Sequence, residues 1–149
     1  MKRFLFLGVV AVMLSSCTAS RMYYWGSNPS SDGGTTRYES LAYRLYDAQS
    51  PQSVCDLVCL YEDMVQHPGG TRGVVPPGIC AEYGYLLLQA STAEAFEKYA
   101  TNKQRRAFES SNYAQIFPEK GEQMLKKEIE LYPESAKFIA PLLKRLTGK

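Results

Sequence analysis

Cysteine, histidine and carboxylate side chains are the groups through which this chain would carry out acid, base, nucleophilic or metal chemistry. Among its 149 residues there are four cysteines and one histidine. The histidine, His67, lies in an expected loop, where we interpret it as solvated. Two acidic pairs are interpreted as charges on solvent-facing helix surfaces: Glu62 with Asp63, and Glu128 with Glu130. The sequence contains no phosphate-binding loop, nucleophile elbow or glycine-rich dinucleotide fingerprint, so we expect a non-enzymatic protein without a cofactor.

The first cysteine ends a secretory leader. Two basic residues are followed by an apolar run at 4–14 that is too short for an ordinary membrane span. The run closes with Leu14-Ser15-Ser16-Cys17, which resembles the bacterial lipobox. In that signal the cysteine is diacylated, becomes the first residue after cleavage and is acylated again on its amine. The resemblance implies a signal peptide at 1–16 and a lipid anchor at Cys17; a soluble secreted protein cut nearby is the alternative.

The residue after the cysteine and the charge balance bear on location and partners. Thr18 stands where an aspartate could, and by resemblance to enterobacterial sorting this favours the outer membrane.

The 17 Lys and Arg residues exceed the 15 Asp and Glu residues only through Lys2 and Arg3 of the leader. The mature chain therefore lacks the basic excess that phosphate backbones require, and we expect no nucleic-acid partner. Membrane association comes from the acyl chains, at about 0.8 kcal/mol per buried CH₂.

The three remaining cysteines, Cys55, Cys59 and Cys80, would lie in an oxidising compartment. Cys55 and Cys59 are four residues apart on one expected helix, at a separation poorly suited to a disulfide. We predict instead that one of them pairs with Cys80, and we favour Cys59, which is nearer to the loop that leads to Cys80. Three buried small hydrophobic residues are the alternative. A metal site that combined them with His67 is not expected, because the spacing matches no familiar zinc module.

The sequence predicts that an all-α body positions these groups. Residues 17–36 are rich in Ser, Gly and Pro and are interpreted as a flexible lipidated tether, which is followed by one helical domain at 37–149. Pro51, after Ser50 as cap, and Pro118 are each expected at the first position of a helix. Apolar residues recur at three- and four-residue spacing in five segments: 38–46, 50–67, 79–89, 118–132 and 134–146.

The helix at 79–89 is apolar nearly all round, which indicates a central position contacted on several sides. Gly84 in its middle costs about 1 kcal/mol relative to alanine, and we expect close backbone approach of a neighbouring helix to offset that cost. The two C-terminal helices are expected to close against it. The stripe of the last helix consists of apolar residues: Phe138, Ile139, Leu142, Leu143 and Leu146.

Two motifs resemble the tetratricopeptide repeat. They are Tyr83-Gly84 followed by Leu87, and Gly121, Leu125, Glu128 and Pro133 at the offsets of the repeat's second helix. The chain departs from the repeat at Glu128, where a small residue is usual, and in an insert at 91–116, where the repeat has a tight turn. The resemblance implies helical hairpins with a helical insert. One divergent repeat cannot bury its own face, so flanking helices must complete the core.

An aromatic segment, Tyr23, Tyr24 and Trp25, interrupts the tether. Its rings either dock on the helical body or rest at the lipid interface, or they form an exposed strand-like segment that a partner captures.

A wider resemblance is to the small bacterial lipoproteins of domain-of-unknown-function family 4810. It rests on the lipobox, Tyr24-Trp25-Gly26, Pro76-Pro77-Gly78, and Tyr132-Pro133-Glu134-Ser135 with Phe138. Members are often encoded beside lipoproteins similar to the curli secretion channel, which by association implies a role in an outer-membrane assembly.

We therefore expect a lipid-anchored, non-enzymatic interaction or accessory module of an envelope complex. Its contact surface would be the segment Tyr23, Tyr24 and Trp25, or a groove around Tyr83, Tyr85 and the aromatic residues of the insert. The alternative is a periplasm-facing lipoprotein that binds a small molecule or an envelope polymer and uses the insert as a lid.

Overall fold

The computed structural model describes residues 20–26 and 34–148. Within these ranges the fold is all-α, as predicted, with seven α-helices and no strand. In chain order the elements are α2 (Arg37–Ala48), α3 (Pro51–Gln66), α4 (Ile79–Leu87), α5 (Ala90–Tyr99), α6 (Asn102–Arg105), α7 (Tyr113–Leu131), the 3-10 turn η1 (Pro133–Ser135) and α8 (Ala136–Thr147).

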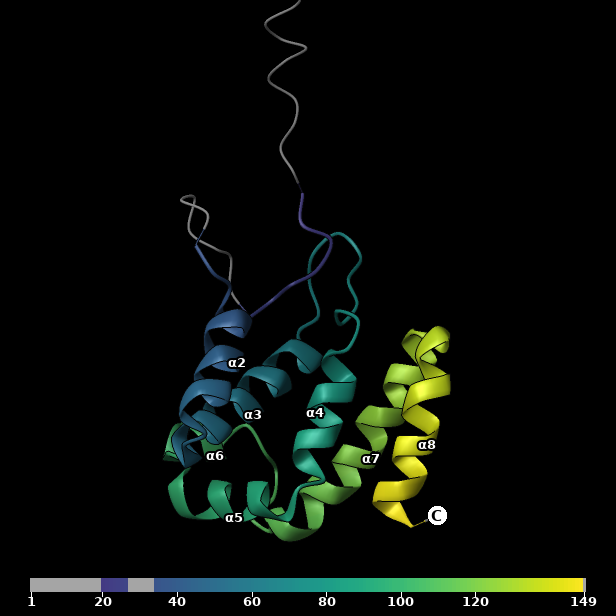
Figure 1. Ribbon diagram of the computed structural model, residues 1–149. Helices are drawn as coiled ribbons and strands as arrows, with labels where there is room; N and C mark the ends of the chain where they lie inside the picture. The colour runs from purple at the N-terminus through teal and green to yellow at the C-terminus, as the bar shows by residue number, and fades with distance from the viewer. Residues whose placement is uncertain (1–19, 27–33, 149) are drawn as a thin grey trace, which may run out of the picture.

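The helices form an up-and-down arrangement closed at one end by a crossing segment (Figure 1). α2, α3 and α4 run alternately down and up, and α5 crosses below them. α7 then returns along α4 and makes with it the most extensive helix contact in the described chain. α8 packs on α7 and η1 at the outer edge of the body.

Local sequence signals set the starts of α2 and α3. The Thr36 side chain accepts a hydrogen bond from the Glu39 amide, and Glu39 reaches back to the Thr36 amide, which makes a capping box. Ser50 caps α3 through the Ser53 amide, and Pro51 occupies the first turn. The predicted cap and proline at 50–51 are therefore confirmed.

The start predicted for α7 at Pro118 is wrong, because the helix begins at Tyr113 and contains Pro118. Tyr113 and Phe117 are buried, and their rings pack against Phe96 at centroid distances of 4.9 and 5.3 Å. Burial of these rings stabilises the extra turn and outweighs the hydrogen bond that proline cannot donate.

The segment at 91–116 is joined to the core through one face of α5, while residues 101–103 and 109–112 are exposed. Its helix α5 packs on α3 and α7, and Phe96 is completely buried at the centre of an aromatic cluster. Phe108, in the loop before α7, contacts Phe96 edge to face with centroids 5.2 Å apart. α5 is therefore a fixed part of the core, and the use of the insert as a lid stays a prediction.

α8 is less enclosed than its sequence pattern predicts. Ile139 is buried, Leu142, Leu143 and Leu146 are half-buried, and Phe138 is 69% exposed. The expected apolar stripe therefore lies only in part against α7, and Phe138 lies outside the contact. The physical reason is that α8 has a helix on one side only.

The expected close approach at Gly84 is confirmed, and its partner is Gly121 on α7. A Cβ atom placed on Gly84 would lie 2.7 Å from the carbonyl oxygen of Gly121, and one on Gly121 would lie 2.9 Å from the carbonyl oxygen of Gly84. Both obstacles are backbone atoms, which cannot rotate away. The two helices are thus in contact through their main chains.

We predict that Gly84→Ala lowers the free energy of unfolding by about 1–3 kcal/mol, the usual cost of overpacking. The sign is informative, because alanine in an unobstructed helix interior would instead stabilise by about 1 kcal/mol. Urea unfolding followed by circular dichroism measures the change. Glu130→Ala, at an exposed position of α7, is the control and should stay within about 0.5 kcal/mol of wild type. A Gly84→Ala protein as stable as wild type would contradict the contact.

Candidate functional site

A cavity of about 550 Å³ opens between the C-terminal half of α3, the N-terminal half of α7 and the loop at 107–110. Its lining combines carboxylates, amides, one ammonium group and a small apolar surface. The lining residues are Glu62, Gln66, Ala107, Phe108, Glu109, Ser110, Ile116, Glu119, Lys120 and Gln123.

Glu62, in the wall of this cavity, is a buried carboxylate with a side chain 7% exposed. It accepts hydrogen bonds from the Tyr83 hydroxyl at 2.7 Å, the Gln66 amide at 3.0 Å and the Lys120 ammonium at 2.5 Å. A buried charge with this set of donors is compensated, whereas one left unpaired would be costly.

The interpretation of Glu62 as a solvent-facing charge is therefore wrong. The signal that could have shown this is its register, because Glu62 falls on the same stripe of α3 as the buried residues Cys55, Val58 and Val65. Its partners Tyr83 and Lys120 lie 21 and 58 residues further along the chain, so the sequence offered no way to pair them.

Glu128 is a second buried carboxylate that the sequence misassigned to the surface. From α7 it accepts the Gly78 amide at 2.8 Å and the Ala81 amide at 3.3 Å. Gly78 is the N-cap of α4 and has no side chain to bind these amides, so Glu128 supplies the cap from another helix. Negative charge at a helix N-terminus is favourable, which makes this contact structural.

Tyr83 joins the cavity to the core and does not reach the surface. Its side chain is completely buried, with its hydroxyl on Glu62. It therefore cannot touch a partner directly, and its predicted role as a surface contact is wrong. Burial and, second, the Glu62 charge raise the pKa of Tyr83 well above its usual value, because both disfavour the phenolate.

A series of rings continues from Tyr83 towards the N-terminal segment. The centroids of Tyr83 and Tyr61 are 5.5 Å apart, those of Tyr61 and Tyr38 6.2 Å, and those of Tyr38 and Trp25 5.2 Å. The hydroxyls of Tyr61 and Tyr38 both donate to Glu82, at 2.7 and 2.8 Å. Burial is the larger cause, and these hydrogen bonds the second, of the raised pKa of the Tyr61 and Tyr38 hydroxyls.

The aromatic segment is docked on the helical body. The Thr71 amide donates to the Arg21 carbonyl at 2.9 Å, and the Arg72 side chain donates to the Tyr23 hydroxyl at 2.8 Å. The Tyr24 hydroxyl donates to Asp63 at 3.2 Å. Figure 1 shows this segment, in purple, beside the loop between α3 and α4. Within the predicted tether, residues 21–26 are thus bound to the body, with 23–25 half-buried and Gly26 buried, while the expected lipid anchor Cys17 lies outside the described residues.

Tyr85 lies on a different face from the cavity. It is 47% exposed and lines a groove of about 670 Å³ between α2, α3 and α4. Tyr46, 82% exposed, lines the same groove. The structure therefore separates the predicted contact residues into a docked segment, one buried ring and one surface ring. The use of Tyr23, Tyr24, Trp25 and Tyr85 in partner binding stays a prediction.

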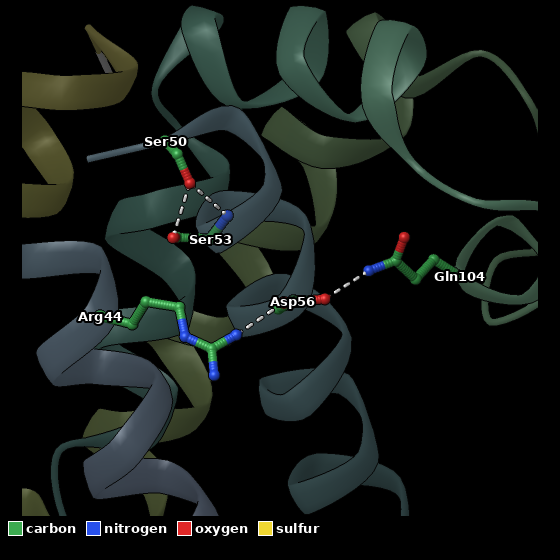
Figure 2. A network of polar contacts seen from close by, with 5 residues as sticks. All are labelled: Arg44, Ser50, Ser53, Asp56 and Gln104. Atoms are coloured by element: carbon green, nitrogen blue, oxygen red, sulfur yellow. Dashed lines mark hydrogen bonds and ion pairs between the residues drawn. The ribbon is translucent and has the colours of Figure 1, made fainter. Parts of the chain in front are cut away.

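Asp56 holds α2 and α6 against α3 (Figure 2). Its carboxylate accepts from the Gln104 amide at 2.8 Å and lies 3.5 Å from the Arg44 guanidinium. Gln104 also closes a capping box with Thr101 at the start of α6. Arg44, Asp56 and Gln104 bind one another, so this network positions α2, α3 and α6.

The predicted disulfide between Cys59 and Cys80 is not formed, because Cys55, Cys59 and Cys80 are all free thiols. Cys59 faces the Gln104 carbonyl of α6 at 3.8 Å, whereas Cys80 on α4 lies near Glu128 of α7. Burial raises the pKa of all three thiols, to about 11, 12 and 11 in chain order. The alternative of three buried small hydrophobic residues holds for Cys55 and Cys80, whereas Cys59 is half-buried. In the described residues no cluster of three or more His, Cys, Asp or Glu is placed to hold a metal ion.

Comparison with known proteins gives no relative. The chain matches no protein family, no curated protein and no solved structure. Over 20–26 and 34–148, no helix combines the length and hydropathy needed to cross a bilayer.

The buried tyrosines predict a loss of stability at alkaline pH. Their pKa values are raised in the folded state, so the folded protein retains protons that the unfolded chain releases above pH about 10. The free energy of unfolding should therefore fall above pH 10, by about 1.4 kcal/mol per pH unit for each such tyrosine.

Urea unfolding of wild type and Tyr61→Phe between pH 9 and 11.5 measures this slope, and the variant should show a shallower one. Tyr43→Phe is the control, because the Tyr43 ring is 71% exposed. Equal slopes for Tyr61→Phe and wild type would show that the Tyr61 hydroxyl is not held protonated by the fold.

Proposed function

We propose that this chain is an outer-membrane lipoprotein, anchored through acylated Cys17, whose helical body is a non-enzymatic interaction or accessory module of an envelope assembly. The resemblance drawn from the sequence suggests a neighbour similar to the curli-secretion-channel lipoproteins as the partner class. The observation that carries the proposal is the docking of residues 20–26 on the body, directly after the proposed anchor.

The docked segment would orient the body on the membrane. Four peptide units separate Cys17 from Arg21, so the two Cα atoms lie at most about 14 Å apart. The end of the body that carries the loop between α3 and α4 would then lie next to the lipid. α5 and the C-terminal end of α8, at the opposite end in Figure 1, would point away from the bilayer.

Exposed aromatic rings support an interaction role. Tyr43, Tyr46 and Tyr85 are exposed on α2 and α4, and Phe138 is exposed on α8. Tyrosine and other large aromatic residues are common among the residues that dominate binding energy in protein interfaces. These rings lie on two faces, so the body offers more than one surface to an assembly.

The finer architecture that we propose is a divergent tetratricopeptide-like hairpin made by α4 and α7. The main-chain contact between Gly84 and Gly121 supports it, since both glycines belong to the motifs that resemble the repeat. α5 and α6 form the insert between the two helices, and α3 and α8 flank the hairpin.

A second candidate function is the binding of a small molecule or an envelope polymer. The cavity beside Glu62 favours it, because its volume falls in the range of about 300–1,000 Å³ that ligand sites occupy. Its carboxylates and amides can hydrogen-bond a polar ligand. The two functions are compatible if the ligand group belongs to the partner.

Affinity purification from detergent-solubilised membranes tests the interaction role. We expect a stoichiometric envelope protein to be recovered with wild type and lost with Trp25→Ala, because removal of this ring loosens the aromatic segment from Tyr38. Ser40→Ala, at an exposed position of the same helix as Tyr38, is the control and should retain the partner.

A Cys17→Ser variant tests the anchor in the same cells. It should be found in the soluble fraction, where it no longer recovers the partner. Normal processing and undiminished membrane association of Cys17→Ser would contradict the proposed topology, and a folded wild-type protein recovered alone would contradict the interaction role.

A further inference from the structure

We propose that the cavity beside Glu62 binds an alkylammonium group, supplied by a lysine side chain of the protein partner. That the group belongs to a protein rests on the function proposed above. The chemistry of the cavity is independent of it and follows from the lining residues.

The charge of the lining selects the sign of the ligand. Glu62, Glu109 and Glu119 contribute three carboxylates, and Lys120 contributes the one ammonium group of the lining. Lys120 is paired with Glu62 inside the cavity. Glu109 and Glu119 are exposed, and neither forms an ion pair with another described residue. The cavity is therefore left with an excess of negative charge that attracts a cation and repels a carboxylate or phosphate.

The cavity already holds one alkylammonium group of its own. The Lys120 nitrogen lies 2.5 Å from a Glu62 oxygen and 5.5 Å from the centre of the Phe108 ring. A carboxylate together with an aromatic face is the arrangement that favours a desolvated cation. The internal lysine occupies these contacts itself, so an incoming ammonium group would bind the unpaired carboxylates of Glu109 and Glu119 beside it.

The shape of the lining fits a lysine side chain better than a compact cation. Phe108, Ile116 and Ala107 provide apolar surface for a methylene stem. Glu109 on the loop and Glu119 on α7 provide carboxylates that can bind the ammonium group of the ligand. Lysine buries its stem on such surfaces while its ammonium group keeps polar contacts. A bare metal ion would use the oxygens alone and leave the apolar surface unused.

The test uses the purified full-length lipoprotein in detergent and nuclear magnetic resonance titrations. The probes are a Gly-Gly-Lys-Gly-Gly peptide with blocked ends, the same peptide with Nε-acetyl-lysine, 1,5-diaminopentane and glutarate. Acetylation removes the charge and leaves the stem. We expect saturable shifts of the amides at 107–110 and at Lys120 with the lysine peptide and the diamine. We expect none with the acetylated peptide or glutarate.

Two double variants with the same change in net charge distinguish binding in the cavity from nonspecific electrostatic attraction. Glu109→Gln with Glu119→Gln should weaken binding of the lysine peptide at least tenfold. Glu130→Gln with Glu134→Gln, at exposed positions outside the cavity, should change it less than twofold. All four residues are exposed, so these variants leave the core contacts intact.

Each remaining outcome overturns a defined part of the inference. Absence of saturable binding by both amines, or equal binding of the acetylated peptide or glutarate, overturns the alkylammonium site. Binding of the diamine without the lysine peptide overturns the assignment to a partner protein. Failure to recover a partner from membranes contradicts the proposed function but leaves this titration unaffected, so the two failures are distinguishable.

Discussion

The main-chain contact between Gly84 and Gly121 is the constraint on which the rest of the structure depends. It brings α4 and α7 together until only hydrogen fits at the crossing point. α4 carries Tyr83 and α7 carries Lys120, and both side chains reach Glu62 on α3. The buried carboxylate in the cavity wall therefore keeps both partners only where this crossing holds three helices in register.

Carboxylates do much of the positioning of the helices. Glu62 joins α3 to α4 and α7, Glu82 receives two tyrosine hydroxyls, and Glu128 caps α4 from α7. Each interaction links elements that are far apart in sequence. Glu62 and Glu128 are buried, and removing one partner of a buried charge is costly, so their contacts disfavour other arrangements of the same helices. The ring series from Trp25 to Tyr83 extends the same network to the N-terminal segment.

The sequence was sufficient to predict those features of the fold that depend on local signals. The all-α class follows from apolar periodicity, the start of α3 follows from Ser50 and Pro51, and the close approach at Gly84 follows from a glycine in an apolar helix. The helix start predicted at Pro118 was wrong, because the burial of Tyr113 and Phe117 stabilises the extra turn by more than the local preference of proline for a helix start.

The candidate site could not be predicted for a related reason. Glu62 and Glu128 were assigned to solvent by residue type, since the Lys120 and α4 amide partners that make their burial favourable are distant in the chain. The cysteine pairing failed because spacing along a helix does not tell which neighbour each face meets, and Cys59 and Cys80 meet different helices.

Native-state hydrogen exchange of the full-length protein tests the central role of the α4–α7 contact most directly. Because these helices touch through their main chains, their amides, including that of Ala81 bound by Glu128, should exchange last and only through global unfolding. The amides of α8, which packs on one side only, should exchange earlier. Exchange of the α4 and α7 amides before those of α2 or α8 would contradict the account.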